Sequence, residues 1–155
     1  MRWFVAGGAI LLPIPGPAWA ASCSASATGL AFGTYIPSTP TAATSTGTIT
    51  VNCSNLGPKT VSYTIALNAG LNGGGVFTNR RMANGAARLS YQIYRDAARS
   101  QIWGDGTGGT TVVSAKCTIT LTTCSSSNTV YGSIPASQSP TPGSYTDTIT
   151  ATVTY

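Results

Sequence analysis

The final segment of the chain, residues 143–155, constrains the fold more than any other part of the sequence. From Tyr145 onward, every second residue is Thr. Strict alternation with a period of two predicts a β-strand that has one buried and one solvated face. Threonine suits the solvated face because it is β-branched yet soluble. The alternation leaves open whether this strand is paired within its own sheet or borders a position that another chain fills. The residues between the threonines are Tyr145, Asp147, Ile149, Ala151, Val153 and Tyr155.

The composition agrees with an all-β domain. The 155 residues suffice for one domain, charged residues make up only 7%, and Gly (18) and Pro (9) are frequent. This is typical of short strands joined by turns, and the regular apolar alternation argues against disorder. About seven or eight short strands are expected, with turns roughly every ten residues, which favours an immunoglobulin-like β-sandwich. Besides the terminal strand, the segments that predict strands are residues 30–32, 46–53, 61–67, 89–93, 110–113, 116–122 and 129–134.

Residues 1–20 have the pattern of a secretory signal peptide. Arg2 precedes an apolar run, residues 3–12, and a Pro-rich segment then ends in Ala18-Trp19-Ala20. We expect cleavage after Ala20, which leaves residues 21–155 as the exported domain. The run is too short for a transmembrane helix and no later run could span a bilayer, so no stable membrane insertion is expected.

Export makes the four cysteines candidates for disulfide bonds. Three pairings exist, and we favour Cys23–Cys53, which ties the mature N-terminus to a strand end, and Cys117–Cys124, which closes a short loop. Zinc is a poor alternative because the chain has no His and the cysteine spacings are not those of zinc sites.

The sequence argues against catalysis and against nucleic-acid binding. Asp96, Asp105 and Asp147 are its only carboxylate side chains, and no His is present to activate a serine. No phosphate-binding or calcium-binding pattern occurs, so no cofactor is expected. The net charge is +5, but the basic residues are dispersed and no nucleic-acid-binding motif appears.

Several segments together resemble the spore coat protein U family, the Csu-type subunits of archaic chaperone–usher pili. They follow one another over nearly the whole mature chain, and Cys117 and Cys124 are not part of the pattern. The segments are Leu-Ala-Phe-Gly-Thr-Tyr (30–35), Gly-Thr-Ile-Thr-Val-Asn-Cys (47–53), Arg-Met (81–82), Leu-Ser-Tyr-Gln-Ile-Tyr-Arg-Asp-Ala-Ala-Arg (89–99), Trp-Gly-Asp-Gly (103–106), Val-Tyr-Gly-Ser-Ile-Pro-Ala (130–136) and Gly-Ser-Tyr-Thr-Asp-Thr-Ile (143–149).

The resemblance implies a sandwich that lacks its last strand. A periplasmic chaperone would lend a strand beside the C-terminal one, an outer-membrane usher would export the subunit, and the N-terminal extension of the next subunit would replace the lent strand in a surface fibre that serves adhesion or biofilm formation. The carboxylate of Tyr155 would anchor basic residues of the chaperone. By position, the groove would be bordered by Ile149, Ala151, Val153 and Tyr155, with Leu30 and Phe32 across it.

The short N-terminus departs from that pattern. Cleavage after Ala20 would leave only Ala21 and Ser22 before Cys23, about 7 Å of extended chain, whereas filling a groove takes roughly ten residues or ~34 Å. The hypothesis is that this subunit receives a strand but does not donate one, at a fibre tip or as a secreted coat component.

Two alternative functions stay open. One is a stand-alone extracellular coat or matrix protein with a complete sandwich. The other is a carbohydrate-binding module with Trp103, Tyr91 or Tyr94 as a stacking platform, although a core position is the favoured interpretation of Trp103.

Overall fold

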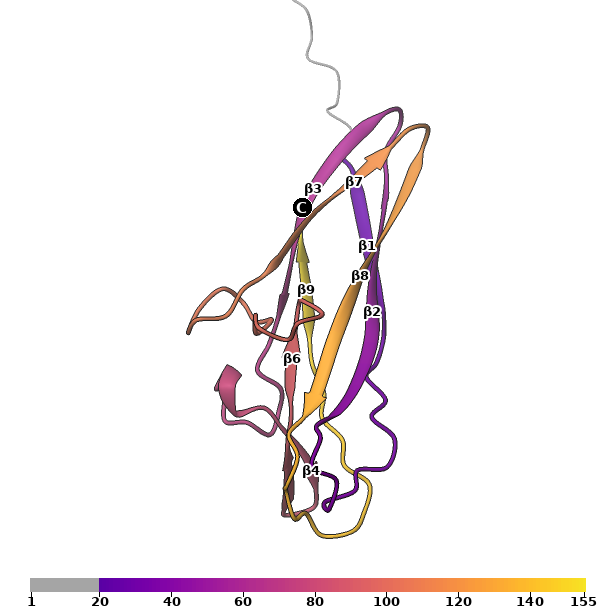
Figure 1. Ribbon diagram of the computed structural model, residues 1–155. Helices are drawn as coiled ribbons and strands as arrows, with labels where there is room; N and C mark the ends of the chain where they lie inside the picture. The colour runs from indigo at the N-terminus through magenta and orange to yellow at the C-terminus, as the bar shows by residue number, and fades with distance from the viewer. Residues whose placement is uncertain (1–19) are drawn as a thin grey trace, which may run out of the picture.

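The computed structural model describes residues 20–155, so the predicted signal peptide lies outside the described residues except for Ala20. The described chain is built from β-strands and one short 3₁₀ helix, arranged as an elongated body (Figure 1). The elements are β1 (Ser22–Thr28), β2 (Ala43–Ser54), β3 (Lys59–Leu67), η1 (Phe77–Asn79), β4 (Arg81–Asn84), β5 (Ala87–Ser90), β6 (Gln92–Tyr94), β7 (Val113–Ile119), β8 (Thr123–Ile134) and β9 (Ala151–Thr154).

The strands form two main sheets and a separate hairpin. One sheet has the order β1-β2-β8-β6, the other has the order β7-β3-β9, and β4 pairs with β5. All of these pairings are antiparallel. Alternate residues of both sheets meet in a single apolar core, which is the arrangement of an immunoglobulin-like β-sandwich. The buried apolar side chains of this core include Ile49, Val51, Val61, Tyr63, Ile65, Leu67, Leu89, Ile93, Ile119, Val130 and Ile134.

Both predicted disulfides are confirmed. Cys23–Cys53 joins β1 to β2 within the first sheet. Cys117–Cys124 joins β7 of the second sheet to β8 of the first. The two sheets are therefore covalently linked at one end of the sandwich.

The predicted strands at residues 46–53, 61–67 and 129–134 are confirmed, and β2, β3 and β8 extend beyond them. The prediction of one strand over residues 89–93 is wrong, because the chain changes partners at Tyr91: β5 pairs with β4, whereas β6 pairs with β8. The two short strands predicted between 110 and 122 are one strand, β7. Tyr94 ends β6, residues 95–99 form bends and a turn, and Asp96 accepts the backbone N–H groups of Ser100 and Gln101.

The first and last predicted strands also differ from the structure. The strand expected around Leu30 and Phe32 lies earlier in the chain, as β1, and both residues are outside regular structure. The terminal strand is regular only from Ala151, and Thr146 forms a single bridge with Ala83. Just before Ala151, Asn68 bonds to Thr150 twice: its side-chain oxygen accepts the Thr150 N–H (3.0 Å) and its backbone N–H donates to the Thr150 carbonyl (3.0 Å).

Trp103 occupies the centre of the core and is fully buried, at 0% exposure. Its indole Nε1–H donates to the carbonyl of Ile65 in β3 (2.9 Å), and its backbone N–H donates to the carbonyl of Ile93 in β6 (3.0 Å). Trp103 thus bonds to both sheets.

No helix within residues 20–155 has the length and apolar character needed to cross a bilayer.

Candidate functional site: a groove between the ends of the two sheets

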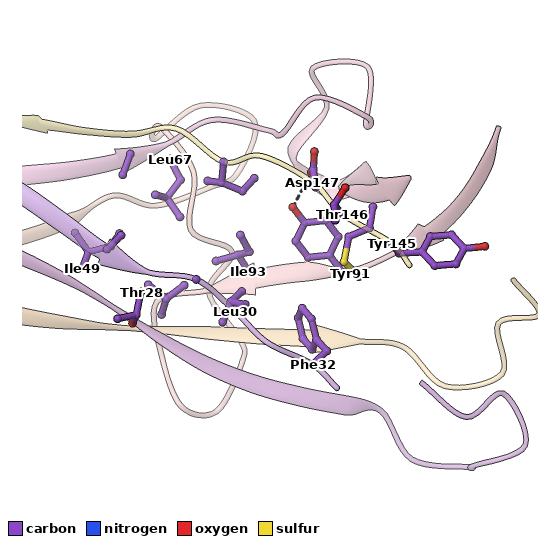
Figure 2. A pocket seen from close by; sticks show the side chains of 16 residues that line it. Thr28, Leu30, Phe32, Ile49, Leu67, Tyr91, Ile93, Tyr145, Thr146 and Asp147 are labelled. Atoms are coloured by element: carbon purple, nitrogen blue, oxygen red, sulfur yellow. Dashed lines mark hydrogen bonds between the residues drawn. The ribbon is translucent and has the colours of Figure 1, made fainter. Parts of the chain in front are cut away.

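An elongated groove separates the chain that follows β1 from the chain that leads into β9. It consists of two cavities, of about 320 Å³ and about 610 Å³, which share Leu30, Phe32, Met82 and Tyr145 in their walls. Figure 2 shows the first cavity with side chains from both sheets directed into it. Its main lining residues are Ala27, Leu30, Phe32, Ile49, Leu67, Met82, Tyr91, Ile93, Val130, Tyr145, Asp147, Ile149 and Ala151.

Both walls of the groove have backbone groups without a backbone hydrogen-bond partner in the described chain. β9 is the last strand of its sheet and pairs only with β3 among the described strands. On the opposite wall, residues 30–35 belong to no strand and make no backbone–backbone hydrogen bond within the described chain. Unpaired backbone groups along an apolar groove are the requirements for adding a strand.

The floor of the groove is apolar and depends on one glycine. A Cβ atom at Gly132 of β8 would lie 2.7 Å from Leu30 Cδ1 and 2.7 Å from Phe32 Cζ. The missing side chain therefore makes room for two side chains of the wall. Phe32 also packs edge-on against Tyr91, with ring centroids 6.3 Å apart.

Among the described residues, Asp147 is the only charged one that lines either cavity, and its hydrogen bonds hold one wall in place. Its carboxylate accepts hydrogen bonds from Tyr91 OH (2.7 Å), the Leu71 N–H (3.0 Å) and Asn72 Nδ2 (3.0 Å). Gly70, whose φ is +82°, allows this close approach, because a Cβ atom there would collide with the carboxylate. The wall around Asp147 is thus held to the loop that follows β3 and to Tyr91. Figure 2 shows the bond between Asp147 and Tyr91.

Arg80 lies fully buried beside this polar cluster, at 0% exposure. Its guanidinium donates to three neutral oxygens: Gln92 Oε1 (2.7 Å), the Asn68 carbonyl (2.7 Å) and the Trp103 carbonyl (2.8 Å). It also lies over the ring of Phe77, 5.4 Å from the centroid. Burial lowers the pKa of Arg80, whereas Tyr91 and Asp147 act to raise it.

The buried Tyr91 hydroxyl predicts a loss of stability in alkaline solution. Burial raises the pKa of Tyr91 above its ordinary value, and the hydrogen bond to Asp147 raises it further. Because the folded-state pKa is the higher one, the stabilisation is complete below pH ~10 and is lost as the pH rises above the unfolded-state pKa. We expect the thermal unfolding midpoint to fall above about pH 10.

Tyr91→Phe supplies the comparison, because it removes the ionisable hydroxyl and keeps the ring. Its midpoint should be lower near neutral pH, where the bond to Asp147 is missing, and should fall less steeply in alkaline solution. Parallel pH profiles for the two proteins would contradict the assignment.

The structure places four of the six predicted groove residues at the cavities. Leu30, Phe32, Ile149 and Ala151 line the first one. Val153 lies opposite Ile65 and packs against the core, and Tyr155 is 57% exposed; neither lines the two cavities of the groove.

Sequence reasoning missed Asp147 and Tyr91 as partners. The available signal was a single carboxylate on the otherwise apolar face of an alternating segment.

The proposed stacking platform is wrong for two of its three residues. Trp103 is fully buried and Tyr91 is only 6% exposed, so neither ring can stack on a sugar. Tyr94 is half-buried at the end of β6.

Together, the fold and the groove define the class of this protein, an immunoglobulin-like sandwich with an apolar groove beside the free edge of β9. The chain belongs to the Spore Coat Protein U domain family, whose model matches residues 12–152. It is similar to Protein U of Myxococcus xanthus, with 30% identity over 134 residues that cover 81% of this chain and 71% of the relative.

A solved structure has a similar fold. It is the crystal structure of the CsuC–CsuE chaperone–tip adhesion subunit pre-assembly complex from the archaic chaperone–usher Csu pili of Acinetobacter baumannii. The TM-score is 0.52 at 20% identity, and the match covers 87% of this chain but only 40% of that chain.

Proposed function

We propose that this protein is a structural subunit of a chaperone–usher surface fibre and that its groove accepts a β-strand from another polypeptide. The observation that carries the proposal is an apolar floor between two walls: β9, whose second edge has no strand partner in the described chain, and residues 30–35, which belong to no strand. The Spore Coat Protein U domain and the fold shared with a chain from a chaperone–tip subunit complex support it.

The chemistry is strand addition. A donor strand would bond to the free edge of β9, and its alternate side chains would enter the groove between Ile149 and Phe32. Val153 and Tyr155 would extend this edge beyond the cavities. About ten residues, or ~34 Å of extended chain, would fill such a groove.

The partners that follow are a periplasmic chaperone, which lends a strand during export, an outer-membrane usher, and neighbouring fibre subunits. The protein would then be exported by its signal peptide and reside on the cell surface, where it serves adhesion or biofilm formation. Its role is structural rather than catalytic.

A position at the fibre tip is a finer part of this proposal. Residues from Ser22 onward are already paired with β2, so a donor segment would have to precede Ser22. With cleavage after Ala20, too few residues remain to donate. N-terminal sequencing of the exported protein tests this, and a mature start well before Ala21 would exclude the tip position.

A stand-alone coat protein is the second candidate. The observation in its favour is that Leu30 and Phe32 already insert over Gly132 and fill part of the groove. Expression with and without the periplasmic chaperone of the same cell separates the two functions. A soluble, stable monomer made alone would favour the coat protein, whereas aggregation alone and a soluble 1:1 complex with the chaperone would support the fibre subunit.

Ile149→Asp tests the groove directly. A carboxylate in place of an apolar side chain that faces the donor should weaken chaperone capture by about 10-fold to 100-fold, since burying such a side chain is worth ~1.5–3 kcal/mol. Thr148→Asp is the matched control, because Thr148 is exposed on the other face of the same segment. Capture measured by co-purification should fall for the first variant only. Equal capture of both variants would place the donor strand elsewhere.

A further inference from the structure

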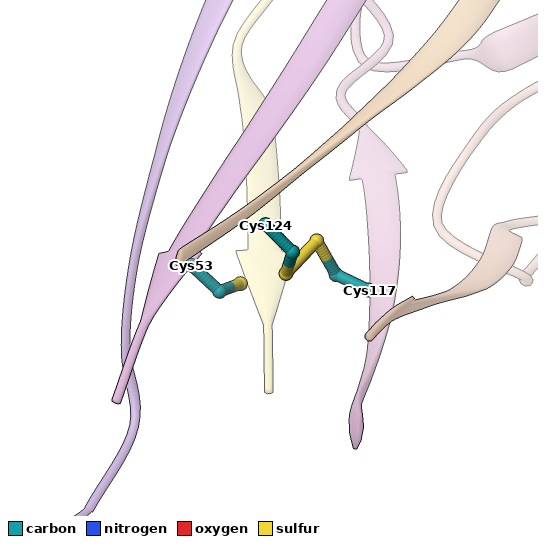
Figure 3. A group of neighbouring side chains, drawn as sticks. All are labelled: Cys53, Cys117 and Cys124. Carbon is teal, nitrogen blue, oxygen red and sulfur yellow. A yellow bond between two sulfur atoms is a disulfide. The ribbon is translucent and has the colours of Figure 1, made fainter. Parts of the chain in front are cut away.

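Cys53 lies in register with two other cysteines. On β2 it is directly opposite Cys23 of β1 on one side and Cys124 of β8 on the other. The sulfur atoms of Cys53, Cys117 and Cys124 all lie within 4.8 Å of one another (Figure 3). The folded arrangement of strands therefore brings Cys53 close to two different partners.

The other cysteines have different neighbours: Cys117 and Cys124 lie near each other and near Cys53, whereas Cys23 lies opposite Cys53. Cys23 and Cys124 are on strands that flank β2 on opposite sides, and Cys117 is on β7 in the other sheet. A Cys53–Cys124 bond would fit neighbouring antiparallel strands, whose opposite Cα atoms lie ~4.5–5.5 Å apart, within the range of disulfides. It would leave Cys23 without its partner, and β1 would lose its covalent tie.

Loop length separates the competing reactions. Cys117 and Cys124 are 7 residues apart, and Cys23 and Cys53 are 30 apart. Cys53 and Cys124 are about 70 apart, so the three-halves-power rule for loop closure favours Cys117–Cys124 over Cys53–Cys124 by roughly 30-fold. The short loop should close first and remove Cys124 from the competition.

We propose that the Cys117–Cys124 disulfide directs the pairing of the other two cysteines. By occupying Cys124 early, it leaves Cys23 as the only available partner for Cys53. Each bond forms when two protein thiols reduce one disulfide of an oxidant such as glutathione disulfide, which yields one protein disulfide and two glutathione thiols. The result is that β1, whose last residues Ala27 and Thr28 line the groove, is fixed to β2.

Cys117→Ser tests the proposal. The variant is reduced, refolded with a mixture of glutathione and glutathione disulfide, and mapped by non-reducing peptide mass spectrometry. In this variant Cys53 can close a loop of 30 residues with Cys23 or one of about 70 residues with Cys124. The ratio of these loop lengths predicts that about one fifth of the molecules carry Cys53–Cys124 and a free Cys23. The unaltered protein should show no such isomer.

The double variant Cys117→Ser/Cys124→Ser is the matched control. It bears the same serine in place of Cys117, but Cys53 has only Cys23 to pair with. Homogeneous Cys23–Cys53 is expected in the double variant. The proposal is overturned if Cys117→Ser alone also yields homogeneous Cys23–Cys53, or if the double variant fails to form that bond while it folds.

A time course on the unaltered protein keeps the test independent of how well the variants fold. Thiols are trapped by alkylation at intervals during oxidative refolding. Cys117–Cys124 should appear before Cys23–Cys53, and the reverse order would refute the proposal. Neither experiment depends on whether the groove accepts a strand.

Discussion

Replacing Trp103 with alanine is expected to lower the free energy of unfolding by about 3–5 kcal/mol, enough to unfold a marginally stable domain. The indole is completely buried, and its Nε1–H satisfies the carbonyl of Ile65. The substitution therefore opens a large cavity and leaves a buried acceptor without its donor. Urea unfolding followed by circular dichroism measures the loss.

Trp103→Phe is the matched comparison, because it keeps most of the ring volume and removes the N–H donor. It should cost less than Trp103→Ala, with about 1–3 kcal/mol arising from the unsatisfied carbonyl. If Trp103→Ala instead kept full stability and lost binding to a glycan, the core role described here would be wrong and a carbohydrate-binding function would regain support.

Arg80→Met is expected to destabilise the fold by about 3 kcal/mol or more, because three acceptors lose their hydrogen bond from the guanidinium at once. Methionine fills much of the same space, so the loss reports mainly on the hydrogen bonds. Apolar replacement of a buried ion pair can be stabilising, but here the partners are backbone and amide oxygens that stay polar after the substitution.

Arg80→Lys should give an intermediate loss, since an ammonium keeps the charge but lacks the planar fork that reaches Asn68, Gln92 and Trp103 together. Differential scanning calorimetry of the three proteins provides the ranking. If Arg80→Met were as stable as the unaltered protein, these bonds would contribute nothing net to stability.

The strands that sequence analysis located correctly are those whose partners impose one uniform pattern. β2 and β3 are covered on one face along most of their length, so burial alternates residue by residue, as the sequence does. The cysteine pairing could be predicted because few alternatives were available. Export and the spacing of Cys117 and Cys124 restricted the choice before any geometry was known.

The failures occur where distant segments override the local pattern. The alternation through Tyr91 continues without interruption, yet the chain leaves one sheet there and enters another, which no local rule encodes. Residues 145–150 alternate perfectly, but they bond to the loop after β3 instead of forming a regular strand. The Thr150 N–H donates to the Asn68 side chain, and the Asp147 carboxylate accepts the Leu71 N–H. The groove floor at Gly132 could not be predicted either, because a glycine in a strand does not reveal which side chains will pack over it.

The β4–β5 hairpin gives the groove one further property. Ala83 exchanges two backbone hydrogen bonds with Thr146 (2.8 and 3.1 Å), and β3 holds the same segment from Ala151 onward. The segment between these points is therefore held at both ends. A donor strand would not have to immobilise it on binding, which lowers the entropic cost of association. Substitutions in the hairpin that weaken the bonds between Ala83 and Thr146 would therefore loosen the receiving edge and slow or weaken assembly.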